Sequence, residues 1–178
     1  MEQTQKTALL SLPPLAVGYI LAVLFVVGAA AIGIVWPQAY EAFDEGSDTN
    51  LAELILTLVW LPGFIYWLIC VNRIHKVIYS LTGDTYPITP GRAVWFHFIP
   101  FYNLYWIFKW TSEAVKFINV NSTDKRMSPT VPGVLLLIGF LIGDGIGLIL
   151  MFIALRGIMQ GIKKAIEFPV AEAAQGQT

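Results

Sequence analysis

The chain has 178 residues, of which 56% are hydrophobic and 13% are charged, whereas ordinary soluble domains have about 45–50% and about 25%. Its 11 basic and 12 acidic residues give a formal net charge of −1, so the charge balance does not indicate nucleic acid as a partner. This composition excludes an ordinary soluble domain, and the length predicts a single integral membrane domain over residues 1–178.

The first half of the chain contains two apolar runs, and each has the roughly 20 residues that a helix needs to cross a bilayer. The first, at about 14–36, carries no charge and ends at Trp36-Pro37, an interfacial ring followed by a helix stop. The second, at about 51–71, contains Pro62-Gly63, which predict a kink, and it ends just before Arg73. Both runs are predicted to be transmembrane helices.

A third run, at about 93–110, is crowded with aromatic side chains, since residues 95–110 read WFHFIPFYNLYWIFKW. A water-soluble helix needs a polar face, and here every face carries a ring, which favours a membrane segment. Pro100 is predicted to break this helix and to free the backbone carbonyl about four residues before it. Asn103 then either joins neighbouring helices beside a structural kink, or belongs to a site built on a broken helix, as in transporters.

A fourth run, at about 132–155, is predicted to be the last transmembrane helix. Gly139, Gly143 and Gly147 recur in it at a spacing of four residues, which predicts a face for close packing against another helix. Asp144 falls near the centre of this predicted span, where an ionised group costs about 2.5–3.5 kcal/mol. It therefore indicates either packing or assembly through a hydrogen bond, or a pathway for protons or ions.

His97 is a weak candidate for a cofactor ligand. A buried imidazole in an aromatic pocket suits a haem or a chlorin. The other of the two histidines, His75, is expected at a helix end. A pair of ligands is therefore not expected, and no cofactor is predicted. A structural, hydrogen-bonded histidine is the preferred interpretation. No phosphate loop or metal-ligand spacing is present in the sequence, so an enzyme is not expected.

The Lys and Arg residues beside the runs predict the topology. The loop between the first two runs has four acidic residues and no basic one, which places this loop away from the cytoplasm and the N-terminus inside. Four crossings, the preferred arrangement, leave both termini in the cytoplasm, and the tail at 169–178 is predicted to be mobile. This arrangement puts four basic residues on the wrong side. They move inside if the third run dips into the membrane and returns, which takes the C-terminus outside. The four are Lys109, Lys116, Lys125 and Arg126.

The third run also carries a family resemblance. The segment Phe98-Ile99-Pro100-Phe101-Tyr102-Asn103-Leu104, preceded by Thr89-Pro90-Gly91 and Ala93-Val94, resembles an uncharacterised bacterial membrane family, domain of unknown function 4328. Members carry Phe-Ile-Pro, two residues and Asn-Leu in the third of about four helices. Many have a second proline soon afterwards, where this chain has Tyr105-Trp106. The resemblance implies a multi-pass protein of the bacterial inner membrane and brings no activity with it.

The sequence therefore predicts an all-α membrane protein, a bundle of about four transmembrane helices whose third is broken at Pro100 and could be re-entrant. The leading functional hypothesis is a noncatalytic accessory, structural or assembly subunit of a larger bacterial membrane complex. Its expected partners are the lipid bilayer and other membrane subunits or further copies of itself. One alternative is a small transporter or channel that uses Asp144 and the broken helices. The other is a haem- or chlorin-binding membrane protein that uses His97.

Overall fold

The structure is a computed structural model that describes residues 2–35, 51–122 and 126–167, and within these ranges it contains helices and no strand. The prediction of an all-α protein is confirmed. Among the described residues, three helical segments are long and apolar enough to cross a membrane, namely Lys6–Val35, Leu54–Thr85 and Gly145–Glu167. In chain order the helices are α1 (Glu2–Leu10), α2 (Leu15–Val35), α4 (Leu51–Thr82), the 3-10 helix η1 (Gly83–Thr85), α5 (Pro90–Trp95), the 3-10 helix η2 (Phe96–Phe98), α6 (Tyr102–Asn121), α7 (Thr130–Ile142) and α8 (Gly145–Glu167).

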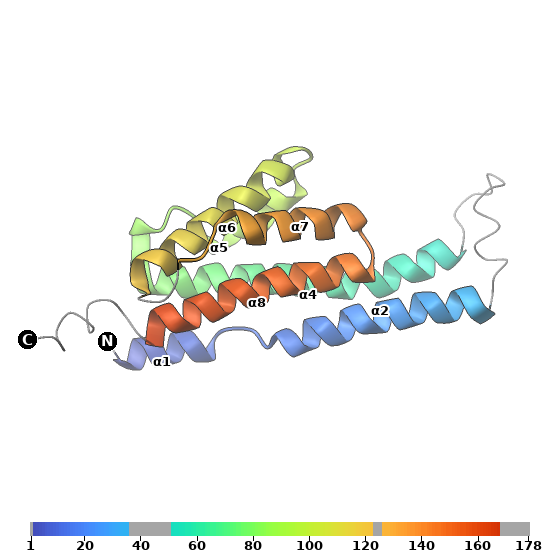
Figure 1. Cartoon of the computed structure of the whole chain (residues 1–178), viewed down its shortest axis with the longest axis horizontal. Coiled ribbons are helices and arrows are strands. Elements are labelled where there is room, and N and C mark those ends of the chain that lie inside the picture. Colours follow the sequence, from blue (N-terminus) through green and yellow to red (C-terminus); the bar gives the residue numbers. More distant parts are fainter. Residues whose placement is uncertain (1, 36–50, 123–125, 168–178) are drawn as a thin grey trace, which may run out of the picture.

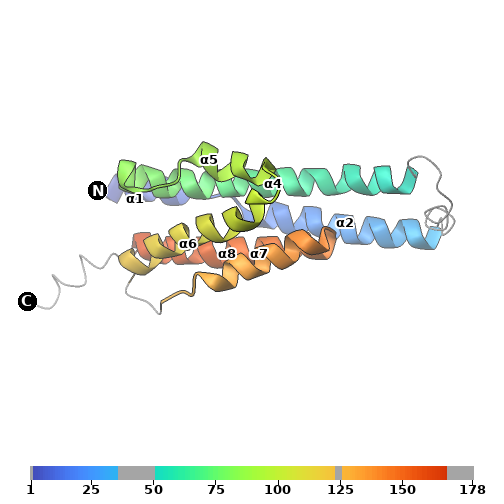
Figure 2. The ribbon, with the colours of Figure 1, turned by 90° about the horizontal axis from the view of Figure 1, so that it is seen from above.

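The longest feature of the molecule is an antiparallel hairpin of α2 and α4, which extends beyond the other helices at one end (Figures 1 and 2). The opposite end, which we call the terminal end, holds the start of α1, the helix η1 and the end of α8. The first predicted run matches α2. The second run was predicted to end at residue 71, which is wrong, because α4 continues to Thr82. Ile74, Val77 and Ile78 keep one face of this extension buried.

The third run is broken where the sequence predicts a break. Thr89 caps α5 by accepting a hydrogen bond from Arg92 N at 3.4 Å, and Pro90 occupies the first turn, where a missing N–H costs nothing. After η2 the chain turns at residues 99–101, and α6 runs back toward the terminal end as far as Asn121, well past the predicted end at residue 110 (Figure 2). Phe101 in this turn has a φ of 61°, an unusual conformation for a bulky residue.

The continuous helix predicted over 132–155 is wrong. The run is divided into α7, which leaves the terminal end, and α8, which returns to it beside α7 (Figure 1). Gly143 ends α7 in the left-handed conformation with a φ of 67°, which glycine adopts without steric cost. The turns at 99–101 and 143–144 both stop short of the far end of the α2–α4 hairpin (Figures 1 and 2).

The hydrophobic core lies between α4, α6 and α8, with α2 and α7 packed on its outside. Its largest fully buried side chains include Trp67, Ile74, Ile78, Ile107, Trp110, Phe152, Leu155 and Ile158. Along each helix these residues lie three, four or seven positions apart, so one stripe of each helix faces the core. The core is concentrated in the half of the molecule toward the terminal end, where α4, α6 and α8 lie together.

Candidate functional site

The predicted glycine face does not exist as one face of one helix, because its members lie on both sides of the α7–α8 turn. Gly143 forms the turn itself, and its backbone N–H donates to the Gly139 carbonyl at 3.2 Å. Gly139 and Gly147 instead face one another across the hairpin. A Cβ added to Gly139 would stand 2.6 Å from the Gly147 carbonyl oxygen and 2.8 Å from Met151 Cγ. Close packing is therefore present, but it joins two halves of the same run.

Asp144 is not in the middle of a helix, which corrects the second expectation for this run. It stands directly before α8, and its Oδ1 accepts a hydrogen bond from Gly147 N–H at 2.9 Å. Its carbonyl accepts the first helical bond, from Leu148 N–H at 2.9 Å. This is the geometry of a helix N-cap, in which the carboxylate satisfies a free N–H of the first turn. The side chain is partly exposed, so the arrangement supports a structural role better than an ion pathway.

Pro100 lies in an exposed turn and not inside a helix. The carbonyl of Pro100 accepts from Tyr102 N–H at 2.6 Å, and the carbonyl of Ile99 accepts from Asn103 N–H at 3.1 Å. The chain changes direction here, so the expected opening of a continuous helix is replaced by a turn. The Asn103 side chain is buried, and its Oδ1 has no hydrogen-bond partner among the described residues.

His75 and His97 come together around Trp110, although a pair was not expected. The ring centroid of His75 lies 5.4 Å from that of Trp110, and the His97 centroid lies 6.3 Å from it. His97 also packs edge-on against Trp67 at 5.0 Å. The error arose from the end predicted for the second helix, since His75 is fully buried within α4. Its position next to Ile74 on the buried stripe is the signal that could have placed it in the core.

In each of the two imidazoles, one ring nitrogen lies within hydrogen-bond distance of a partner. His75 Nδ1 is 2.8 Å from the Tyr86 hydroxyl, and His97 Nδ1 is 3.3 Å from the Val94 carbonyl. Burial, together with the charge of Glu113, raises the pKa of the Tyr86 hydroxyl, so this hydroxyl keeps its proton in the bond to His75. The Nε2 atoms of both rings are buried and have no partner among the residues described, as is also true of the indole nitrogens of Trp67 and Trp110.

This cluster of His75, Tyr86, His97 and Trp110 suits a structural polar network better than a cofactor site. Trp110 makes T-shaped contacts with both imidazoles, and Trp67 makes a further T-shaped contact with His97. Within the described ranges, no group of three or more His, Cys, Asp or Glu side chains could hold a metal ion. The chemistry that the cluster offers is hydrogen bonding by neutral rings in an aromatic core.

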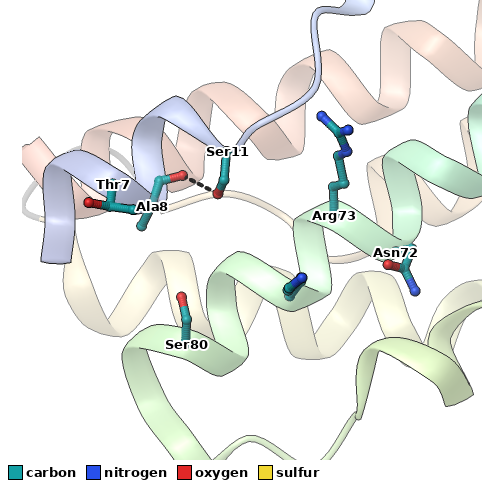
Figure 3. Close-up of a pocket in the computed structure, with 7 residues that line it drawn as sticks. Thr7, Ala8, Ser11, Asn72, Arg73 and Ser80 are labelled. Atoms are coloured by element: carbon teal, nitrogen blue, oxygen red, sulfur yellow. Dashed lines mark hydrogen bonds between the residues drawn. The ribbon is translucent and has the colours of Figure 1, made fainter.

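A second candidate site is a groove between α1 and α4, shown in Figure 3, which we call the α1–α4 groove. It has a volume of about 830 Å³ and is lined by Thr7, Ala8, Ser11, Asn72, Arg73, Lys76 and Ser80. Of the lining residues of α4, Arg73, Lys76 and Ser80 recur at intervals of three and four, so they share one face of the helix. Sequence reasoning missed this groove because α1, with only 9 residues, was not predicted as a helix.

Two smaller basic grooves lie nearby. One, of about 370 Å³, runs along the α1–α2 junction at Pro13 and Pro14 and includes Arg156 and Lys163 of α8. The other, of about 180 Å³, lies between α6 and α8 and includes Lys164. Every described Lys and Arg is on α1, on the last part of α4 or on the segments from α5 to α8. The part of the α2–α4 hairpin that extends beyond the bundle has none.

No protein-family model, curated protein or solved structure matches the chain. The resemblance of the segment around Pro100 to the domain of unknown function 4328 stays a prediction.

Proposed function

We propose that the protein is a noncatalytic accessory or assembly subunit of a larger complex in the bacterial inner membrane. The observation that carries the proposal is the surface of α2 beyond the bundle. Gly145, at the start of α8, lies against Ala22, Phe25 and Val26, so α2 from Gly28 onward extends beyond α8 and has only α4 beside it among the described helices. A Cβ added to Gly28 would meet nothing within 4 Å.

This surface suits a second membrane helix. Val27, Ile34 and Val35 are exposed, Ile34 by 81% and Val35 by 82%. Inside a bilayer the association of helices depends on close approach of backbones at small residues. Gly28 is partly exposed and offers such a position on α2, since no atom of the described residues lies within 4 Å of a Cβ added there.

The test is a substitution at Gly28 that the isolated chain can accommodate. Gly28→Leu projects into open space, so it should leave the fold intact and remove a larger assembly that forms through this face. Val23→Leu, at an exposed position about 140° round the helix, is the matched control. The proteins would be extracted from membranes in mild neutral detergent, and the mass of each particle would be measured. A wild-type protein that runs as a single copy, or a Gly28→Leu assembly of unchanged mass, would contradict the proposal.

We also propose that α2 and α4 cross the membrane. The two later hairpins, one formed by α5, η2 and α6 and the other by α7 and α8, enter the membrane from the cytoplasmic side and return to it. Helix lengths support this arrangement. α7 has 13 residues and spans about 20 Å, and α5 has 6 residues, whereas a bilayer core is about 30 Å thick. A hairpin whose first helix is too short to cross the bilayer must have both of its ends on the same side of the membrane. Lys109, Lys116 and Arg126 then share the cytoplasmic side with the other described cations, as the positive-inside rule requires.

This topology is tested by thiol labelling in a Cys70→Ala background. An impermeant reagent added to intact spheroplasts should label Ser47→Cys and not Ser128→Cys, and inverted vesicles should give the opposite result. Ser128→Cys labelled from outside would support the four-crossing arrangement instead.

A further inference from the structure

The α1–α4 groove combines two unpaired cations with hydroxyl oxygens. Arg73 and Lys76 are exposed and one helical turn apart. The ion pairs found among the described side chains join Glu113 to Lys109 and Lys116, and none involves Arg73 or Lys76. Ser11 and Ser80 donate their hydroxyl protons to backbone carbonyls at 2.7 and 2.8 Å. Their oxygens therefore stay available as hydrogen-bond acceptors in the groove that Arg73 and Lys76 also line.

This donor and acceptor set matches a phosphate diester that carries hydroxyl groups. A guanidinium and an ammonium neutralise one phosphate, because both are strong donors to its oxygens. The hydroxyls of a glycerol headgroup would in turn donate to serine oxygens. Figure 3 shows α1, with Thr7 and Ser11, facing Arg73 and Ser80 of α4 across the groove. The volume of about 830 Å³ is ample for a headgroup.

The position of the groove along the helices points to a lipid. On α4, Arg73 is the first basic residue after the apolar part, which ends at Val71. On the opposite wall, Ser11 lies just before the α1–α2 junction, where the Pro14 carbonyl accepts a hydrogen bond from the Tyr66 hydroxyl at 2.7 Å. The groove therefore begins where the apolar surfaces of both helices end, which is the depth of lipid headgroups in the proposed orientation.

An aliphatic stripe on α4 leads directly to the groove. Its exposed members recur every three or four residues and lie within about 120° of the groove residues around the helix axis. A stripe of this kind accommodates acyl chains while the headgroup occupies the basic end. The members are Leu54, Leu58, Leu61, Ile65 and Ile69, followed one turn later by Arg73.

We infer that the α1–α4 groove binds the phosphoglycerol headgroup of an anionic phospholipid, with the acyl chains along the stripe of α4. The inference rests on the membrane placement proposed above, and it does not depend on a partner protein. Basic pockets between membrane helices on the cytoplasmic side are suited to such headgroups.

The test is a titration of the full-length protein in mild neutral detergent with dioctanoyl phosphatidylglycerol, followed by native mass spectrometry. The double variant Arg73→Gln/Lys76→Gln should bind about 25-fold more weakly, since each cation near an anionic headgroup contributes a factor of about five. Each single variant should lose about fivefold. Arg92→Gln/Arg126→Gln is the matched control, because it removes the same charge from exposed positions that line none of the three grooves.

Three outcomes would overturn the inference. Equal losses in the two double variants would show that overall charge, and not the groove, attracts the lipid. Equal affinity for dioctanoyl phosphatidylcholine would show that the anionic headgroup is not recognised. Inorganic phosphate that binds as tightly as the lipid would make the groove a site for a soluble phosphate. None of these outcomes bears on the particle mass of Gly28→Leu, so the proposed function would fail separately.

Discussion

Gly139 and Gly147 hold α7 against α8, since a side-chain carbon on Gly139 would stand 2.6 Å from the carbonyl oxygen of Gly147. A real Cβ does not approach a backbone oxygen so closely, so the hairpin would have to open. Gly139→Ala should therefore destabilise the protein by about 1–3 kcal/mol, the range for overpacking. Gly28→Ala, which meets open space on α2, should leave stability unchanged or raise it by up to about 1 kcal/mol. Unfolding by SDS in mixed micelles would measure both, and equal effects would refute the close contact.

The N-cap at Asp144 predicts an order of effects. Asp144→Asn should be tolerated, because asparagine caps helices about as well as aspartate, whereas Asp144→Ala should cost about 1 kcal/mol. Proton and cation flux into proteoliposomes should be the same for wild type and Asp144→Asn. A flux present in wild type and lost in a normally folded Asp144→Asn would favour the transporter hypothesis.

The hydrogen bond between Tyr86 and His75, at 2.8 Å, is buried on both sides. Tyr86→Phe would leave His75 Nδ1 unpaired in the core and should cost about 1–3 kcal/mol. Tyr79→Phe is the control, because the Tyr79 hydroxyl donates to Asp84 at an exposed site, and it should destabilise the protein clearly less than Tyr86→Phe does. Thermal unfolding in detergent measures the loss of stability in both variants. Equal losses would mean that the buried hydrogen bond contributes no more to stability than the exposed one.

Glu113 links stability to pH on the acid side. Burial alone would raise the pKa of its carboxyl, but Lys116 at 2.8 Å and Lys109 at 2.9 Å hold the pKa below its usual value. The resulting stabilisation is complete above the unfolded-state pKa of about 4.3 and is lost as the pH falls through the lower folded-state value. Glu113→Gln should remove this part of the pH dependence. Because both lysines are solvated, the difference at pH 7 should be below about 1 kcal/mol.

Phe101 adopts a φ of 61° while its side chain is 89% exposed. Glycine reaches this conformation without strain, and little packing is lost with the ring, so Phe101→Gly should stabilise the fold by about 1 kcal/mol. Phe98→Gly, in the preceding 3-10 helix η2, has no such strain to relieve and should destabilise it. The same detergent unfolding assay measures both variants, and a clear loss of stability in Phe101→Gly would contradict the strained turn.

The sequence was sufficient to predict features set by local chemistry. The helix over α2 follows from an uninterrupted apolar run, and the break near Pro100 follows from the missing N–H of proline. The sequence Gly143-Asp144-Gly145, in contrast, is compatible with two different structures. Glycines at a spacing of four predict a packing face, but a glycine followed by an aspartate also ends one helix and caps the next. The choice between them depends on whether α7 and α8 pack together, which is a tertiary property.

The candidate sites were harder to predict, because each depends on distant segments. His75 and His97 approach one another only since α4 continues past its apolar part and η2 folds back on it. The α1–α4 groove requires the short helix α1 to lie along the part of α4 that carries Arg73 and Lys76. Neither arrangement leaves a periodic pattern within one stretch of sequence, which is the signal that single-sequence reasoning uses.

The hairpins formed by α5, η2 and α6 and by α7 and α8 both return to the terminal end, and this limits how much of the chain must cross the membrane during insertion. In the proposed orientation, the segment at 36–50 is the only connection between helices that must be carried across the bilayer during insertion. This segment has four carboxylates and no Lys or Arg, and acidic residues hinder translocation little. The chain from α5 to α8 can then fold against the inner leaflet after α2 and α4 are inserted, with no further polar loop to export.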